Sequence, residues 1–197
     1  MNAANKASGI VHRKAFAENL LAFSIFAKDK PDAKIYLHTD MFGSFGGWKF
    51  APLLEAVGLD TEQVLFADQV AYRHGIPQNH LAGIYTAMDV YLGASYGEGF
   101  GVGTIEAQAC GTPVIVSNFA ASPELVEDGW LVEGQPLYDA AQLAWFNIPS
   151  VPSIVEALEK AYERGRGRSE KAIKGMEQYD ADFVYKTHWK PVLGKLL

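Results

Sequence analysis

Cysteine is almost absent from this sequence, since Cys110 is the single one among 197 residues. One cysteine cannot form an internal disulfide framework or a zinc site built from several cysteines. Long apolar runs are missing too, because stretches such as residues 20–27 are far shorter than the roughly 20 residues that span a bilayer. The polar stretch 1–14 has no apolar signal-peptide core. These absences predict a reducing, cytoplasmic compartment.

Positive charge is also in short supply. The chain has 17 Lys and Arg against 23 Asp and Glu, so its formal net charge is −6. A surface that holds a nucleic-acid backbone or an anionic membrane needs an excess of positive charge. We therefore expect no nucleic-acid partner, although a local basic cluster can still bind one phosphate group.

Apolar residues are plentiful, with 49% hydrophobic and 12% aromatic residues, as in a compact folded protein. A chain of this length buries about 70% of its unfolded surface. We expect residues 1–197 to form a single domain, with a core over residues 5–150 and a helical tail over residues 151–197.

Strand-like and helix-like segments alternate along the chain. The expected strands are residues 33–38, 64–67, 90–92, 114–116 and 130–132. The expected helices are residues 14–28, 48–57, 79–88, 102–109, a short one from Ser122, 153–164 and 167–179, with a last helical segment to residue 189. Residues 40–47, 69–78 and 133–152 are expected to be loops. This alternation predicts an α/β fold, a Rossmann-like parallel sheet with helices on both faces.

A parallel sheet of this kind also predicts where a ligand binds. Right-handed crossovers place the carboxyl ends of all strands on one edge. The loops at that edge are residues 40–47, 69–78, 93–101 and 117–122. Ligands of open α/β sheets lie in the crevice outside these ends, so we expect the site there.

Four glycines at alternate positions, Gly97, Gly99, Gly101 and Gly103, lead into the expected helix 102–109. Glycine lets backbone N–H groups come close to a ligand, and a helix N-terminus attracts anions. The spacing is neither the G-x-G-x-x-G dinucleotide fingerprint nor a G-K-[S/T] phosphate loop. A phosphate fits such a segment, but a tight turn alone also explains the glycines.

Two carboxylates frame this segment, Glu98 in the loop and Glu106 just over one turn into the expected helix. Carboxylates accept paired hydrogen bonds from vicinal hydroxyls. Taken separately, each glutamate is also explained as a solvated surface residue. Together, beside a phosphate-binding turn, they suggest a ligand with sugars on both sides of a phosphate.

The spacing of Glu98 and Glu106 resembles the E-x7-E motif of retaining glycosyltransferases of the GT-B fold, specifically family 4, or group 1. The flanks are similar to the family pattern as well, over residues 95–117 and 123–132. The resemblance extends from about residue 5 to residue 132, and it identifies the chain with the C-terminal, donor-binding half of such an enzyme.

The resemblance implies that the chain binds a nucleotide-sugar donor, a UDP- or GDP-sugar. It implies that Glu106 binds the ribose hydroxyls, that Glu98 faces the donor sugar, and that Lys14 neutralises the diphosphate. The family's usual Gly-Arg pair is absent, so Arg13, or else Lys6, is the expected second cation. The residues implied in donor binding are Arg13, Lys14, Glu98, Gly99, Phe100, Gly101, Val102, Gly103 and Glu106, with catalytic roles for Glu98 and Lys14.

The implied reaction is a retaining sugar transfer, in which the leaving phosphate takes the proton of the acceptor. Fixed cations and a helix N-terminus can stabilise a leaving diphosphate without a metal, so no metal and no cofactor are expected. The acceptor domain, an N-terminal half, is absent from these residues, and we expect the isolated chain to be inactive without it. Peripheral membrane association is expected only through that half.

Two other readings of the sequence remain open. The chain alone fits a non-catalytic nucleotide-sugar-binding or interaction module, because the acceptor half is missing. The α/β pattern also fits a Rossmann-type NAD oxidoreductase, against which the missing dinucleotide fingerprint counts.

Overall fold

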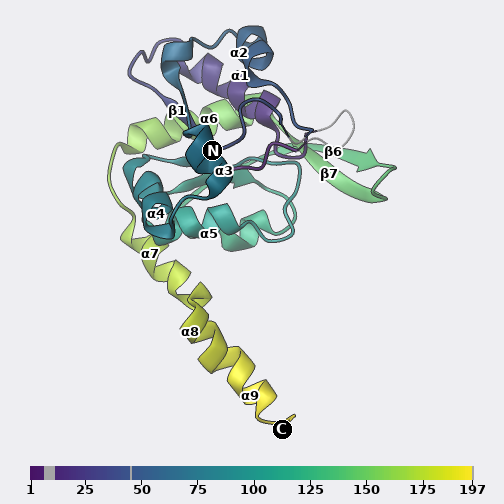
Figure 1. Ribbon diagram of the computed structural model, residues 1–197, viewed down its shortest axis with the longest axis vertical. Coiled ribbons are helices and arrows are strands. Elements are labelled where there is room, and N and C mark those ends of the chain that lie inside the picture. The colour runs from purple at the N-terminus through teal and green to yellow at the C-terminus, as the bar shows by residue number, and fades with distance from the viewer. Residues whose placement is uncertain (7–11, 45, 197) are drawn as a thin grey trace.

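A computed structural model describes residues 1–6, 12–44 and 46–196 (Figure 1). In these residues, five short strands form two parallel sheets, one of two strands and one of three. The strands are β1 (Ile35–Leu37), β2 (Val64–Phe66), β3 (Tyr91–Leu92), β4 (Val114–Ser117) and β5 (Gly129–Val132). β1 pairs with β2, and β4 lies between β3 and β5, with every one of these pairings parallel.

Strand β4 shows why helices cover both faces of the sheet. All of its residues are buried, and successive side chains of a strand point to opposite faces. Ile115 packs into the core formed with α1 and α6, whereas Val114 and Val116 pack with Tyr85 and Ala107 from the other side. A strand that is apolar on both faces needs a helical layer on each.

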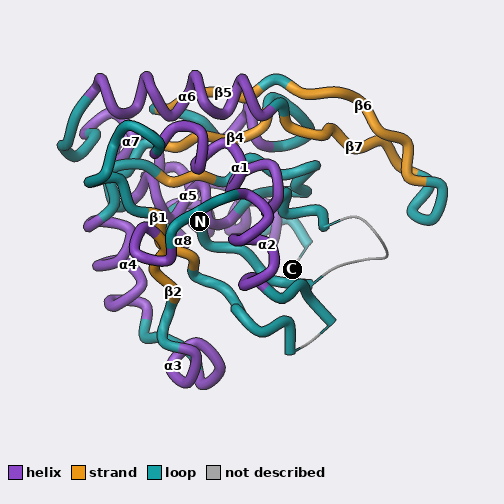
Figure 2. Tube along the Cα trace, turned by 90° about the horizontal axis from the view of Figure 1, so that it is seen from above, coloured by secondary structure: helices purple, strands orange, loops and turns teal. Residues whose placement is uncertain are grey.

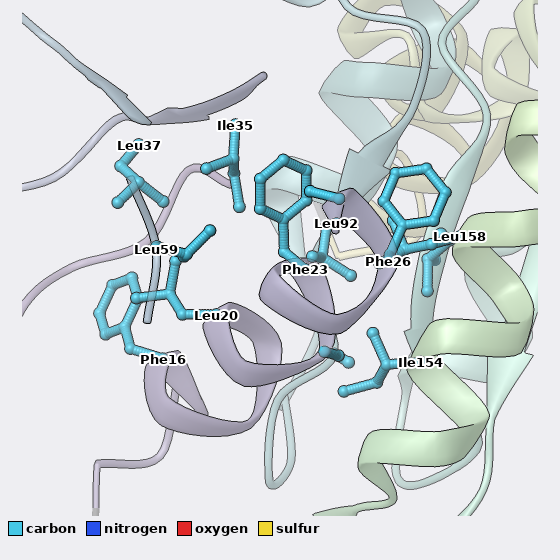
Figure 3. Packing of buried hydrophobic residues seen from close by; sticks show 14 of the residues in the cluster. Phe16, Leu20, Phe23, Phe26, Ile35, Leu37, Leu59, Leu92, Ile154 and Leu158 are labelled. Atoms are coloured by element: carbon cyan, nitrogen blue, oxygen red, sulfur yellow. The ribbon is translucent and has the colours of Figure 1, made fainter. Parts of the chain in front are cut away.

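The first face is covered by α1 (Phe16–Ala27), α2 (Phe50–Val57) and α6 (Val151–Arg164). Figure 3 shows apolar side chains of α1 between the strands and α6. Ile154 and Leu158 of α6 are almost fully buried in this cluster. The core therefore continues past residue 150, into the segment that we expected to be a tail.

The second face is covered by α4 (Gln78–Ala87) and α5 (Val102–Ala109). The bounds of α5 coincide with those expected, and the other expected helices and strands are found within a few residues. The prediction of a Rossmann-like parallel sheet with helices on both faces is confirmed.

Two segments that we expected to be loops have regular structure. Residues 69–78 contain α3 (Gln69–His74). Its N-cap residue is Asp68, whose side chain accepts a hydrogen bond from the N–H of Ala71. Residues 133–152 contain an antiparallel hairpin of β6 (Gly134–Asp139) and β7 (Ala144–Pro149). Figure 2 shows this hairpin extending beyond the parallel sheet. The loop prediction was wrong for both.

The helix expected from Ser122 is a single 3-10 turn, Ser122–Leu125. Its cap position is Ala121, and no side chain caps it. Ser122, the first residue of this turn, is buried.

The N-terminal residues run beside β1 on the edge away from β2. Asn2 forms a parallel bridge with His38, and the N–H of His38 donates to the carbonyl of Met1 at 2.8 Å. The hydroxyl of Tyr91 on β3 donates to the carbonyl of Asn2 at 3.2 Å. This segment therefore connects the two parallel sheets.

The C-terminal residues form α7 (Glu170–Met176), a 3-10 turn (Glu177–Tyr179), α8 (Ala181–Val184), a π-helical turn (Tyr185–Trp189) and α9 (Lys190–Leu193). Helix α7 packs against α5, and the helical run after it projects away from the body (Figure 1). Within the described ranges, no helix has the length and apolar character needed to cross a bilayer.

Candidate functional site

The turn before α1 and the loop after β3 meet at the carboxyl edge of the sheet. The N–H of Tyr96, in the loop, donates to the carbonyl of Arg13, in the turn, at 2.8 Å. Ala15 ends the turn with a left-handed φ of 50°. Asn19 of α1 donates from its side chain to the carbonyl of Ala94 at 2.6 Å, which fixes α1 against the end of β3.

Both cations of the turn bind the carboxylate of Glu98. A guanidinium nitrogen of Arg13 lies 2.9 Å from Oε2, and Nζ of Lys14 lies 2.6 Å from Oε1. The Arg13 guanidinium also donates to the carbonyl of Gly97. Burial raises the pKa of Glu98, but the hydrogen bonds and positive charges of Lys14 and Arg13 lower it by more, so the pKa of this carboxyl group lies below its ordinary value.

A small apolar cluster supports this ion-pair group from behind. Tyr96, Phe146 of β7 and Ala15 pack together, and the N–H of Asn147 donates to the carbonyl of Tyr96 at 2.9 Å. The hydroxyl of Tyr96 donates to Glu18 of α1 at 2.5 Å. The hairpin β6–β7 therefore contacts both the loop after β3 and the turn before α1, and it holds the two together.

The glycine segment enters α5 through one unusual backbone position. Among the four alternating glycines, only Gly101 has a left-handed φ, of 101°, and it is the cap residue of α5. At Gly103 a Cβ would lie 2.7 Å from the hydroxyl oxygen of Tyr91, so a side chain there would displace that tyrosine. For Gly97 and Gly99 the structure shows no comparable requirement.

The side chains of Phe100 and Val102 are largely exposed next to this helix N-terminus. The ring of Phe100 packs edge to face with that of Tyr179 at 5.9 Å, so the C-terminal segment contacts the glycine loop. The role expected for residues 99–103 belongs to their backbone N–H groups, in the segment that leads into the N-terminus of α5.

Glu106 lies on the first turns of α5, where it accepts a hydrogen bond from the hydroxyl of Tyr85 at 2.9 Å. Burial, with the negative charges of Glu98 and Glu106, raises the pKa of Tyr91. Glu98 lies in the loop just before Gly101, the cap residue of α5, and Glu106 lies within α5, so the two carboxylates flank the start of one helix. The structure thus brings the four charged residues expected in the site to the same edge, in two neighbouring clusters.

Sequence reasoning missed the tyrosines that contact these glutamates. Tyr85 and Tyr91 lie on apolar-patterned segments, where a tyrosine is read as part of the core. The loop 40–47 is expected at this edge, and the sequence alone assigns no role to Asp40 within it. Asp40 is buried after β1 and accepts hydrogen bonds from the N–H groups of Phe42 and Ser44, so it shapes its own loop. An aspartate side chain often accepts hydrogen bonds from the backbone N–H groups that follow it in a turn, and Asp40 at the end of a strand is the signal that could have indicated this role.

Among the residues that the structure describes, no three or more His, Cys, Asp or Glu side chains form a group that could hold a metal ion. The sequence contains one Asp-x-Asp triplet, Asp180-Ala181-Asp182. Asp180 caps α8 by accepting from two backbone N–H groups, and Asp182 pairs with Lys186 at 3.1 Å. The triplet therefore starts a helix.

A cavity of about 520 Å³ lies at the opposite, amino-terminal edge of the strands. Its lining includes Phe23, Phe26, Met88, Leu158, Tyr162 and Arg166. None of the expected site residues lines it, so it is separate from the ion-pair group.

Comparison with known proteins agrees with the fold and the motif. The family described as "Glycosyl transferases group 1" matches residues 13–146. The chain therefore belongs to this family, and its fold is that of the C-terminal half of GT-B glycosyltransferases. The family read from Glu98, Glu106 and their flanks is confirmed.

Among curated relatives, the chain is 29% identical over 181 residues to a D-inositol 3-phosphate glycosyltransferase of Arthrobacter sp. (strain FB24), covering 87% of this chain and 41% of the relative. It is 30% identical over 169 residues to an enzyme of the same name from Streptomyces scabiei, covering 82% of this chain and 37% of the relative. The chain thus spans well under half the length of these relatives.

Among solved structures, the C-terminal domain of a glycosyl transferase group 1 family protein from Francisella tularensis matches with a TM-score of 0.56 at 23% identity, covering 91% of this chain and 82% of that domain. The GtfA/B complex matches with a TM-score of 0.68 at 19% identity, covering 98% of this chain and 36% of the matched one. At these identities the structures support the fold alone.

Proposed function

We propose that this chain is the donor-binding domain of a retaining glycosyltransferase that uses a UDP- or GDP-sugar. The observation that carries the proposal is the convergence of Arg13 and Lys14 on Glu98 at the carboxyl edge of the sheet, next to the N-terminus of α5 and Glu106. Two cations and a helix N-terminus suit a diphosphate, and a carboxylate on either side suits the hydroxyls of a sugar and a ribose.

The roles we propose follow from position. Arg13 and Lys14 bind the diphosphate, supported by backbone N–H groups of residues 99–103. Glu106, further along α5, accepts from the ribose hydroxyls, and Glu98, in the loop, faces the donor sugar. Binding of this kind requires that Arg13 and Lys14 exchange at least part of their contact with Glu98 for the phosphate oxygens.

In the proposed reaction the bond between the sugar's anomeric carbon and the diphosphate oxygen breaks. A bond forms from the same face to the acceptor oxygen, whose proton passes to the departing phosphate. Arg13, Lys14 and the helix N-terminus stabilise the negative charge that develops on the diphosphate, which is where fixed charges lower a barrier most. We propose that the acceptor binds to an N-terminal domain outside these residues, as the greater length of the relatives suggests.

Ligand-induced stabilisation tests the binding step. Thermal unfolding would be followed with UDP, GDP, UDP-glucose and GDP-mannose. A ligand at one hundred times its Kd adds about 2.7 kcal/mol to the free energy of unfolding. We expect one of the two base series to raise the Tm, and Glu106→Ala to weaken that effect at least tenfold in Kd, because it removes the proposed ribose acceptor.

Glu163→Ala, at an exposed position on α6, serves as the matched control and should bind like the wild type. Binding that is absent for every nucleotide in the folded protein would overturn the proposal. Sugar transfer and donor hydrolysis by the chain joined to an N-terminal domain distinguish an enzyme from a non-catalytic binding module.

A further inference from the structure

The hydroxyl of Tyr85 lies between two polar side chains inside an otherwise apolar layer. It donates to Oε2 of Glu106 at 2.9 Å and accepts from Nδ2 of Asn2 at 2.7 Å. The residue is only 4% exposed and packs with Ala107 and Val114. A buried hydroxyl with both a donor and an acceptor is held in one orientation, so it fixes the oxygen to which it donates.

The far side of the network is fixed as well. The backbone of Asn2 bridges His38, and its carbonyl accepts from the hydroxyl of Tyr91 at 3.2 Å. The rings of Tyr91 and Tyr85 lie edge to face at 6.0 Å. Gly103 leaves room for the Tyr91 hydroxyl, which a side chain at that position would displace.

The two carboxylate oxygens of Glu106 differ in their hydrogen bonds. Oε2 accepts from Tyr85, while Oε1 has no hydrogen-bond donor among residues 1–6, 12–44 and 46–196. One oxygen is thus fixed by the protein and the other is left for a ligand. A long carboxylate side chain has several rotamers to lose, so fixing it in advance lowers the cost of binding.

We infer that Tyr85 is a positioning residue for nucleotide binding, which orients Glu106 toward the ribose hydroxyls with the help of Asn2. The inference rests on the proposed function and adds a residue that acts through another, without touching the ligand. Its specific consequence is that Tyr85 contributes to affinity only when the ligand carries the hydroxyls that Glu106 accepts.

The test compares a nucleotide with its analogue lacking both ribose hydroxyls. Calorimetric Kd values would be measured for UDP or GDP, whichever binds, and for the corresponding 2′,3′-dideoxynucleotide. For Tyr85→Phe we expect the Kd of the ribonucleotide to rise about 3- to 30-fold and that of the dideoxynucleotide to stay within twofold of wild type. Asn2→Ala, which removes the second contact of the hydroxyl, should show the same selectivity at a smaller amplitude.

Tyr36→Phe is the matched control, since the Tyr36 hydroxyl bonds to His38 at 3.1 Å and not to a glutamate. It should leave both Kd values unchanged. An equal loss for both nucleotides in Tyr85→Phe would assign Tyr85 a merely structural role and overturn the inference, as would no loss for either. Wild-type protein that binds neither nucleotide, or a Glu106→Ala variant that binds like wild type, would instead overturn the proposed function.

Discussion

At the scale of single residues, Glu98 combines partial burial with two cationic partners. Its side chain is 17% exposed, and those of Arg13 and Lys14 are 38% and 22% exposed. Pairs that reach solvent in this way contribute modestly to stability because water and salt screen them. Their more informative effect is the lowered pKa of Glu98, which links the stability of this edge to pH.

The sign of that linkage yields a prediction. A carboxyl group whose pKa is lower in the folded state stabilises the protein fully above its ordinary value of 4.5, and this stabilisation is lost as pH falls through the folded pKa. Glu98→Gln should therefore lower the free energy of unfolding by about 1 kcal/mol at pH 7 and by much less at pH 3. Urea unfolding at both values measures the difference.

The exposed residue Glu55 on α2 offers the control for this measurement. Glu55→Gln should change the free energy of unfolding by less than about 0.5 kcal/mol at either pH. A Glu98→Gln difference that stays constant from pH 7 to pH 3 would contradict the assignment of the ion-pair group as the cause.

At the scale of elements, the hairpin β6–β7 packs against the candidate site on one face and is exposed to solvent on the other. Phe146 is 8% exposed and packs with Tyr96 and Ala15, whereas its neighbour Trp145 is 61% exposed. Adjacent residues of a strand point to opposite faces, so Phe146 packs against the candidate site while Trp145 is exposed to solvent.

Truncating each aromatic residue should therefore have different effects. Phe146→Ala should lower the free energy of unfolding by about 3 kcal/mol, since it leaves a cavity behind the ion-pair group. Trp145→Ala should cost less than about 1 kcal/mol, because it removes only an exposed cross-strand contact with Tyr138. Urea midpoints of the two variants check this, and equal losses would show that the hairpin does not support the loop as described.

The elements also show where sequence reasoning reached its limit. The bounds of α5 could be predicted because their signals are local, a glycine start at Gly101 and a stop at Gly111. The hairpin was missed because its turn has no Asn-Gly or Asp-Gly pair, and instead places Leu143 at a φ of 52°. Helix α3 was missed because it spans only six residues, where periodicity has little meaning.

The residues of the candidate site also fall into two groups, those that the sequence predicts and those that it does not. The charged residues could be named from the motif and its flanks, since their chemistry is visible in sequence. The tyrosine network could not, because Tyr85 and Glu106 are 21 positions apart on different helices, and their contact depends on how α4 packs beside α5. How α4 packs beside α5 depends on contacts between segments far apart in the sequence, so no local sequence pattern predicts it.

At the scale of the whole molecule, the C-terminal helical run is distinct from the body. Within α8, the π-helical turn and α9, no described residue is buried. Helix α7, by contrast, buries Ala172 and Met176 against α5. Local stability follows buried contacts, so the boundary between body and projecting run falls after the 3-10 turn Glu177–Tyr179.

Two truncations test this boundary. Deleting residues 181–197 should change the free energy of unfolding of the body by less than about 1 kcal/mol, measured by urea unfolding with circular dichroism. Deleting residues 170–197 should cost several kcal/mol, because it also removes the buried side chains of α7. A large loss from the shorter deletion would show that the run stabilises the body.

The pairing of Arg13 and Lys14 with Glu98 also bears on which anions can occupy this edge in a cell. Both cations already have a carboxylate partner at 2.9 Å and 2.6 Å, so an incoming anion exchanges one charge partner for another and gains little from charge alone. Inorganic phosphate, which offers nothing further, would compete weakly. A nucleotide sugar also offers hydroxyls to the carboxylates it meets. In the proposed donor site, Glu98 would thus favour a nucleotide sugar over the abundant small anions that an unpaired Arg13 and Lys14 would attract.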